Sequence, residues 1–194
     1  MKKLIGLLLL SLSLPAMAQQ YDIEVILFTR SAETPQLEPS QADSEIDLSH
    51  AGSLSDDAFL AQTGTMRLPR SSFQLNSQEQ ALRTDSALHV LLHTAWRQEV
   101  QAHTTSPIFH IQAGKTYYDQ GTPVHQLDGR LQVYNNQYLY AETIFDLTEP
   151  NTKATLAPLR HARLDQKRRM NAQEIHYFDH EHMGMIIQAR PVQE

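Results

Sequence analysis

Residues 127–147, LDGRLQVYNNQYLYAETIFDL, decide the fold class of this chain. Apolar or small residues occupy every second position in the first part, as expected for a β-strand with one buried face: Leu127, Gly129, Leu131 and Val133. Residues 135–137, Asn-Asn-Gln, indicate a tight turn, because asparagine tolerates the left-handed backbone that a hairpin needs. Residues 138–147 then return as a second strand, so the stretch predicts a β-hairpin.

Two further strands are predicted before this hairpin. Residues 21–29, YDIEVILFT, are rich in apolar and β-branched residues, and Ile26 and Phe28 on the second face suggest burial on both sides. Residues 89–98, HVLLHTAWRQ, alternate in the same way, which places Trp96 in the core.

The C-terminal part continues the β pattern. Residues 163–170 and 173–179 predict a second hairpin, and residues 185–189 predict a last strand. The remaining periodic segment, residues 77–87, predicts a short helix, because Ser77 and Gln80 have the spacing of a capping box. Glu79 and Arg83 add an i,i+4 ion pair on the same helix.

These patterns predict an α+β fold, with a single domain over residues 19–194. We expect a mainly antiparallel sheet of about five to seven strands with one or two short helices. Residues 31–70 depart from the pattern. Between positions 19 and 60 the sequence has nine acidic residues and one basic residue. We expect 31–70 to be a long, acidic and partly mobile excursion, with room for a short helix near 56–62.

Residues 1–18 have the features of a secretory signal peptide. Two lysines precede an apolar run at 4–14, and residues 16–18, Ala-Met-Ala, form a small-x-small cleavage site. The run is about half of the roughly 20 residues that a spanning helix needs, and an uncleaved anchor is the alternative. We therefore expect a periplasmic protein that does not span the membrane and is mature from Gln19.

The chain has a formal net charge of −6 and no cysteine. The absence of cysteine excludes disulfides, cysteine nucleophiles and thiolate metal sites. An acidic exported protein is a poor partner for nucleic acid, whose phosphates require clustered positive charge. The sequence therefore predicts no nucleic-acid partner.

Several catalytic motifs of cell-wall enzymes are missing. No serine precedes Lys115, Lys153 or Lys167 by three positions, so the S-x-x-K motif of acyl transferases is absent, as is G-x-S-x-G. His180-Glu181 begins like a zincin motif, but Gly184 stands where the second histidine is required. A carboxylate pair stays open as an alternative, because sequence spacing does not fix distances across strands. We expect no catalytic residues and no cofactor.

Ten histidines raise the question of a metal site. The densest group is His176, His180 and His182. On a strand, His180 and His182 are about 6.6 Å apart at roughly 3.3 Å per residue, but a third ligand is missing. We predict no metal site.

The candidate ligand-binding residues are tyrosines and basic residues. Tyr134, Tyr138 and Tyr140 flank one turn, and aromatic faces bind the C–H faces of sugars, although sheet cores also recruit tyrosine. A second group lies on one face of a single predicted strand: Arg163, Lys167 and Arg169. Such a strip suits peptide carboxylates, and its alternative role is a solvated sheet edge that prevents aggregation.

Four blocks of the sequence, in this order, carry a family resemblance: YDIEVILFTR at 21–30, HVLLHTAWRQ at 89–98, GRLQVYNNQYLYAETIFDL at 129–147, and RRMNAQEIHYFDHEHMGMIIQ at 168–188. They resemble the CsiV family of peptidoglycan-binding proteins of Gram-negative bacteria. The resemblance covers the chain from residue 19 except the acidic excursion. Glu181-His182 departs from the family, which has a proline-containing continuation after the Asp-His pair.

This resemblance implies a periplasmic protein that binds peptidoglycan without catalysis. It also implies support of a class A penicillin-binding protein through that synthase's outer-membrane lipoprotein activator. It carries over no binding residues. Two alternatives remain open, namely a wall hydrolase or amidase with an unfamiliar site, and a periplasmic assembly or chaperone module.

Overall fold

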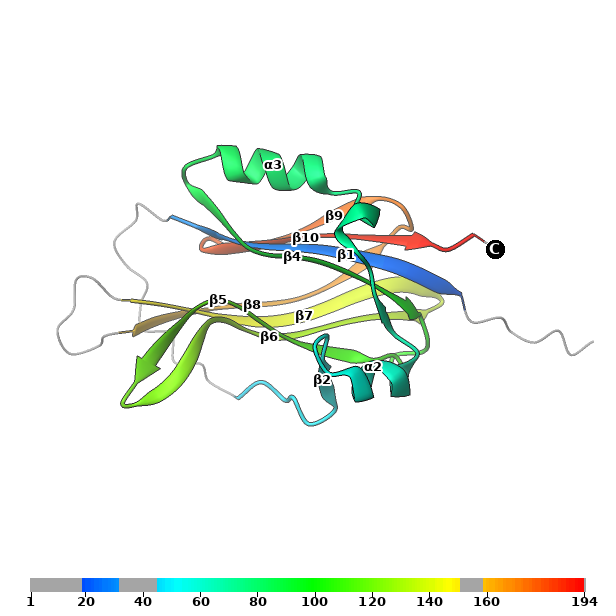
Figure 1. Cartoon of the computed structure of the whole chain (residues 1–194), viewed down its shortest axis with the longest axis horizontal. Helices are drawn as coiled ribbons and strands as arrows, with labels where there is room; N and C mark the ends of the chain where they lie inside the picture. The colour runs from blue at the N-terminus through cyan, green and yellow to red at the C-terminus, as the bar shows by residue number, and fades with distance from the viewer. Residues whose placement is uncertain (1–18, 32–44, 151–158, 194) are drawn as a thin grey trace, which may run out of the picture.

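The computed structural model describes residues 19–31, 45–150 and 159–193. Within these ranges the strands form two five-stranded sheets (Figure 1). Sheet A has the strand order β3 (Met66–Arg67), β4 (Leu88–Glu99), β1 (Gln20–Arg30), β10 (Met183–Pro191), β9 (Ile175–Asp179). Sheet B has the order β2 (Ala51–Ser53), β5 (Ile108–Asp119), β6 (Thr122–Asn136), β7 (Tyr138–Pro150), β8 (Leu159–Met170). All neighbouring strands are antiparallel except the β2–β5 pair.

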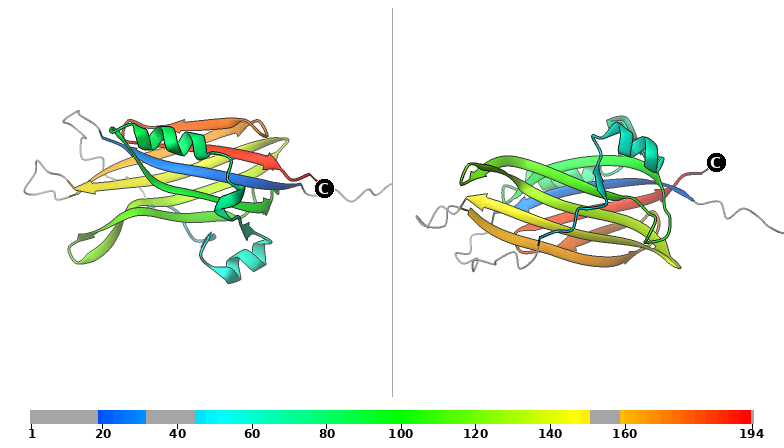
Figure 2. Two further views of the ribbon diagram at one scale, coloured as in Figure 1. Left: turned by 45° about the horizontal axis from the view of Figure 1, so that its top comes forward. Right: turned by 90° about the horizontal axis from the view of Figure 1, so that it is seen from below.

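The two sheets pack face to face and enclose an apolar core, to which both contribute. Figures 1 and 2 show the sheets as two stacked layers. Trp96 of sheet A is fully buried, as predicted, and its ring lies 4.9 Å from that of Phe109 in sheet B. The alternation read from the sequence is the origin of this core, since every second residue of a strand faces the opposite sheet.

Strand β1 is buried on both faces. It lies between β4 and β10, and its side chains on one face point into the core. On the other face, Ile26 and Phe28 pack against Leu75 and Leu82 of the segment that includes helix α3 (Asn76–Thr84). The predicted two-sided burial of this strand is confirmed.

A buried polar network attaches α3 to sheet A. His93 contacts the Glu24 and Glu79 carboxylates through its two ring nitrogens, each at 2.8 Å. Glu24 also accepts hydrogen bonds from the backbone N–H groups of Gln74 and Leu75 and from Arg190, each at 2.8 Å. Burial alone would raise the pKa of Glu79, but the hydrogen bonds from His93 and Arg83 outweigh it and lower that pKa to about 2.

The turns of sheet B use left-handed backbone. Gln120 and Gly121, which join β5 to β6, have φ angles of 47° and 89°. Positive φ at both central residues is the geometry of a type I′ hairpin turn. In the predicted β6–β7 hairpin, which is confirmed, the left-handed residue is Gln137, at 62°, and neither asparagine.

Two predictions about the strands are wrong. A single sheet of five to seven strands was expected, whereas the described residues form two sheets. The expected hairpin of 163–170 with 173–179 is also absent, because β8 pairs with β7 in sheet B while β9 pairs with β10 in sheet A. The chain crosses between the sheets at 171–174, and alternation cannot tell which sheet a strand joins. The α+β class, the antiparallel character and the last strand are confirmed.

The helices partly match their predictions. Helix α3 and its Glu79–Arg83 pair are confirmed, but the capping box is wrong, because Leu75 occupies the N-cap and the Ser77 hydroxyl bonds to Gln78. A helix near 56–62 is confirmed as α2 (Asp57–Thr63), capped by the Asp56 side chain.

Much of the expected excursion carries regular structure. Residues 45–70 include β2, α2, β3 and the start of the 3-10 helix η2 (Arg70–Ser72). Residues 32–44 of the excursion and the predicted signal peptide at 1–18 lie outside the described residues. Neither α-helix in the described part of the chain is long and apolar enough to cross a membrane.

Candidate functional site

The outer face of sheet B, the face turned away from the core, collects all six residues predicted to bind a ligand. Strand register places Tyr134 opposite Tyr140 and Tyr140 opposite Arg169. Three further positions follow on the same side of β7 and β8, because alternate residues share a face: Tyr138, Lys167 and Arg163.

Three tyrosines form an aromatic shelf at one end of this face. The rings of Tyr134 and Tyr140 are stacked, with centroids 5.5 Å apart. Tyr134 is buried at 1% exposure beneath its neighbours on the outer face, whereas Tyr138 is 47% exposed. The shelf therefore has a fixed base at Tyr134 and an accessible surface at Tyr138 and the partly exposed Tyr140.

Two cations lie against the aromatic shelf. The Lys167 ammonium is 5.4 Å from the centroids of both Tyr134 and Tyr140, and the Arg169 guanidinium is 3.4 Å from that of Tyr138. These are cation–π contacts. The nearby Tyr134 hydroxyl is the main cause of a raised pKa at Lys167, with the Glu142 carboxylate as a smaller cause. Positive charge is thus held over the rings of the shelf.

Arg163 is placed differently from the other two basic residues. Its Nε and Nη2 atoms both donate to the Asp146 carboxylate, each at 2.7 Å. This bidentate pair lies on the outer face, several residues along the strand from the shelf.

Glu142 joins the aromatic shelf to a groove. Its carboxylate lies 3.7 Å from His103 and from Arg130, and 3.9 Å from Lys167. These distances are ion-pair contacts and exceed the length of a hydrogen bond. One carboxylate is therefore shared loosely among three bases.

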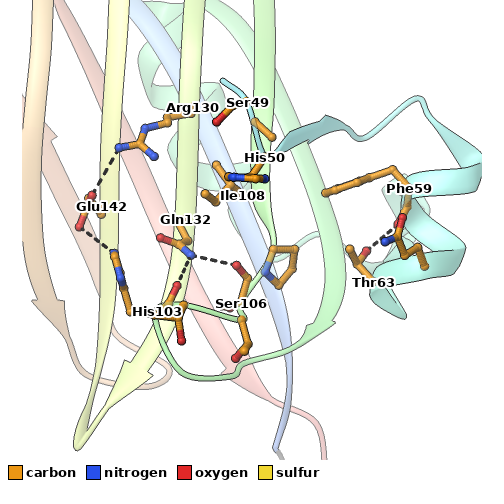
Figure 3. A pocket seen from close by; sticks show the side chains of 15 residues that line it. Ser49, His50, Phe59, Thr63, His103, Ser106, Ile108, Arg130, Gln132 and Glu142 are labelled. Atoms are coloured by element: carbon orange, nitrogen blue, oxygen red, sulfur yellow. Dashed lines mark hydrogen bonds and ion pairs between the residues drawn. The ribbon is translucent and has the colours of Figure 1, made fainter. Parts of the chain in front are cut away.

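The groove, drawn in Figure 3, has a volume of about 790 Å³. It adjoins the shelf, since Glu142 of its lining lies 3.9 Å from Lys167. Its floor comes from β5, β6 and β7, one wall from the loop at 101–107, and the other wall from β2, α2 and the residues preceding them. Hydroxyl, apolar and charged side chains line it together, including Thr63, Phe59, Ile108, Arg130 and Glu142. Figure 3 shows Arg130, Glu142 and His103 grouped at one side of the groove.

Buried hydrogen bonds hold the loop wall in place. The Gln132 side chain, almost fully buried, donates to the backbone carbonyls of His103 and Ser106 at 2.8 and 2.9 Å. The His103 ring packs edge-on against Tyr134, with centroids 4.5 Å apart. The loop is therefore fixed by the same strand, β6, that carries the shelf.

The opposite wall is fixed by packing at Gly52. A Cβ atom at this position would lie 2.2 Å from the Phe59 ring, so only glycine lets the ring lie on β2. Phe59 also meets Phe109 edge-to-face at 5.8 Å, which ties α2 to the core. The excursion thus supplies an ordered wall of the groove.

The family comparison covers nearly the whole chain. Residues 2–192 match the family described as "Peptidoglycan-binding protein, CsiV". The chain belongs to the CsiV family. The family description contains peptidoglycan binding and no catalytic activity, and it implies the cell envelope. No curated protein and no solved structure matches the chain.

For this CsiV family member, sequence reasoning found the shelf and missed the groove. The six predicted residues lie on one face, but only the shelf and its two cations adjoin the groove, and none of the six lines it. The predicted hairpin contains Arg130, Gln132 and Glu142 at alternating positions, so the sequence was sufficient to place them on one face. Nothing in the sequence placed the loop at 101–107 or the 49–63 segment beside them.

In the described ranges, no three His, Asp or Glu side chains are grouped so that they could hold a metal ion. His180 and His182 lie in the connection between β9 and β10, with ring centroids 5.7 Å apart.

Proposed function

We propose that this chain is a non-catalytic accessory protein of the periplasm, which holds peptidoglycan on the outer face of sheet B. The observation that carries this proposal is the aromatic shelf with its two cations. The exposed parts of Tyr138 and Tyr140 offer aromatic surface to the apolar C–H faces of sugars, while Lys167 over Tyr140 and Arg169 over Tyr138 add hydrogen-bond donors for sugar hydroxyls. Membership of the CsiV family supports peptidoglycan as the polymer.

The shelf is suited to binding because its geometry exists before a ligand arrives. Tyr134 is buried and stacked on Tyr140, and Lys167 is held over both rings. Groups that are ordered in advance lose little conformational freedom on binding. Each sugar contact is weak, so we expect affinity to come from repeated contacts along a polymer.

Export and partnership complete the proposal. The features of residues 1–18 support cleavage before Gln19 and release into the periplasm. We further propose that the protein supports a class A penicillin-binding protein through its outer-membrane lipoprotein activator, as the family resemblance implies. Holding the wall and a protein partner at once would raise their local concentration without chemistry.

A pull-down with purified sacculi tests the wall contact. The protein is purified from the periplasm after export, and the wild type is compared with Tyr138→Ala and Tyr140→Ala. We expect the wild type to sediment with sacculi and both variants to bind several-fold less. Tyr118→Ala is the matched control, because Tyr118 is 70% exposed on the β5–β6 hairpin, away from the shelf.

Two outcomes would contradict the proposal. Wild-type protein that stays in the supernatant would exclude wall binding and favour an assembly or chaperone module. Release of soluble muropeptides by the pure protein would favour the hydrolase or amidase alternative.

A further inference from the structure

The groove beside the shelf contains an arginine whose hydrogen-bonding capacity is unused. Arg130 lies 3.7 Å from Glu142, and within the described residues its guanidinium makes no hydrogen bond. Two other arginines of the fold already make paired bonds to a carboxylate, since Arg97 donates to Asp22 at 2.6 and 3.0 Å and Arg163 donates to Asp146 at 2.7 Å from two nitrogens. A guanidinium forms its strongest contacts as such two-pronged bonds to a carboxylate. Arg130 is thus free to take one from a ligand.

The charges around Arg130 favour an anion with a single charge. Arg130 and Lys167 together outnumber the one carboxylate of Glu142 that they share. A ligand carboxylate, with one negative charge, matches this excess of one positive charge better than a doubly charged phosphate does.

The remaining lining suits a short peptide. Ala51, Phe59 and Ile108 offer apolar contact for small side chains, and the exposed side chains of Gln62 and Thr104 add polar groups to the lining. A volume of about 790 Å³ is within the range of sites that enclose small ligands. Because Glu142 touches both Lys167 at the shelf and Arg130 at the groove, a ligand can occupy the two places together.

We propose that the groove is a subsite for the free carboxylate of a short peptide, with Arg130 as its anchor and Glu142 as an internal competitor for that anchor. The inference rests on the proposed function, since peptidoglycan carries short peptides on its glycan. The shelf would hold sugar and the groove would hold the carboxylate end of an attached peptide.

Separate probes for the two places test this subsite. Binding of N-acetyl-D-Ala-D-Ala, its C-terminal amide and N-acetylchitotetraose is measured by NMR titration of the exported protein. We expect the free acid to bind and the amide to bind at least about tenfold more weakly, since a charge-assisted contact is lost. Arg130→Gln should remove this preference and leave the chitotetraose affinity unchanged. Tyr138→Ala should weaken chitotetraose binding and leave the preference for the free acid unchanged.

A second variant distinguishes lost function from lost folding. Glu142→Gln removes the competing carboxylate, so it should tighten binding of the free acid several-fold, which a folding defect cannot do. Arg168→Gln is the control, because Arg168 is exposed on the edge strand with its guanidinium over the Phe178 ring, outside the groove. It should change neither affinity.

Three results would overturn the subsite. They are equal binding of acid and amide, an Arg130→Gln variant that keeps the preference, and inorganic phosphate that competes as well as the peptide acid does. In each case the shelf can still bind sacculi, so the proposed function survives. Failure of the wild type to bind sacculi or chitotetraose would instead overturn the proposed function.

Discussion

Glu79 shows at the scale of one residue how the outer side of sheet A is held. Its carboxylate accepts hydrogen bonds from His93, Arg70 and Arg83, and only 7% of its side chain is exposed. The ionised form is therefore strongly favoured in the folded state. This single carboxylate links helix α3 to the His93–Glu24 pair beneath it.

We predict that acid weakens the fold through Glu79. Its pKa is lowered from an ordinary value of 4.5 to about 2, so its contribution is complete above pH 4.5 and is lost as the pH falls toward 2. The free energy of unfolding should fall by about 2 kcal/mol over this pH range. The loss is no larger because Arg70 and Arg83 are half exposed, so that water screens their charge. Urea unfolding between pH 7 and pH 2 measures it.

Glu79→Gln is the comparison for this prediction. The variant should be less stable at pH 7 and should show a shallower decline between pH 4.5 and 2. Some decline in stability will remain in the variant, because Glu24 also has a lowered pKa. Burial would raise this pKa, but the hydrogen bonds to Glu24 lower it overall. Identical pH slopes for the wild type and the variant would contradict the assignment.

Residue-level patterns predicted half of the candidate site. Tyr134, Tyr138 and Tyr140 are visible in sequence because a tight turn brings the two ends of one hairpin together. Arg130 and Glu142 are equally local, but a lone charge on a strand carries no signal until its neighbours are known. Arg130 lies across from Ile144, whereas Arg163 lies across from Asp146 and pairs with it, and the strand register fixes both neighbours.

At the scale of elements, the β5–β6 turn offers a direct test of local conformation. Gln120 has a positive φ of 47°, which costs an ordinary residue about 1–2 kcal/mol but costs asparagine less. We predict that Gln120→Asn stabilises the protein by about 0.5–1 kcal/mol in urea unfolding. Gly121→Ala, at a φ of 89°, should destabilise it by about 1 kcal/mol although no atom lies in the way.

Opposite signs for these two variants are the essential result. If Gln120→Asn destabilises the protein, or if Gly121→Ala is neutral, the turn does not have the type I′ geometry.

Elements were predicted better than their partners. Alternation located β1, β4, β6, β7 and β10, because each has one face toward the core. It also located β8 and β9, but their predicted pairing is wrong, because these neighbours in sequence lie in different sheets. A chain segment of a few residues serves equally well as a hairpin turn or as a crossing between layers, and only the long-range packing decides.

On the scale of the whole molecule, the first and last strands of the fold depend on each other. Residues 21–29 of β1 pair with residues 183–191 of β10 along their full length. We predict that a chain ending at His182 does not form the sandwich, because the central strand of sheet A loses one neighbour and part of the core is deleted. Near-UV circular dichroism should show no fixed tertiary structure.

A chain that lacks only residues 193 and 194 is the control. It keeps all of β10 and should retain the wild-type spectrum and unfolding midpoint. A native spectrum from the shorter chain would show that sheet B and the rest of sheet A fold without their last strand.

The β1–β10 pairing also sets the timing of folding. Strand β1 must wait for β10, which follows all the other strands in sequence, so sheet A stays incomplete until that segment is synthesised. For the exported protein that we propose, this delay keeps the polypeptide threadable through a translocation channel. The same arrangement that locks the finished sandwich would thus keep the nascent chain open long enough to leave the cytoplasm.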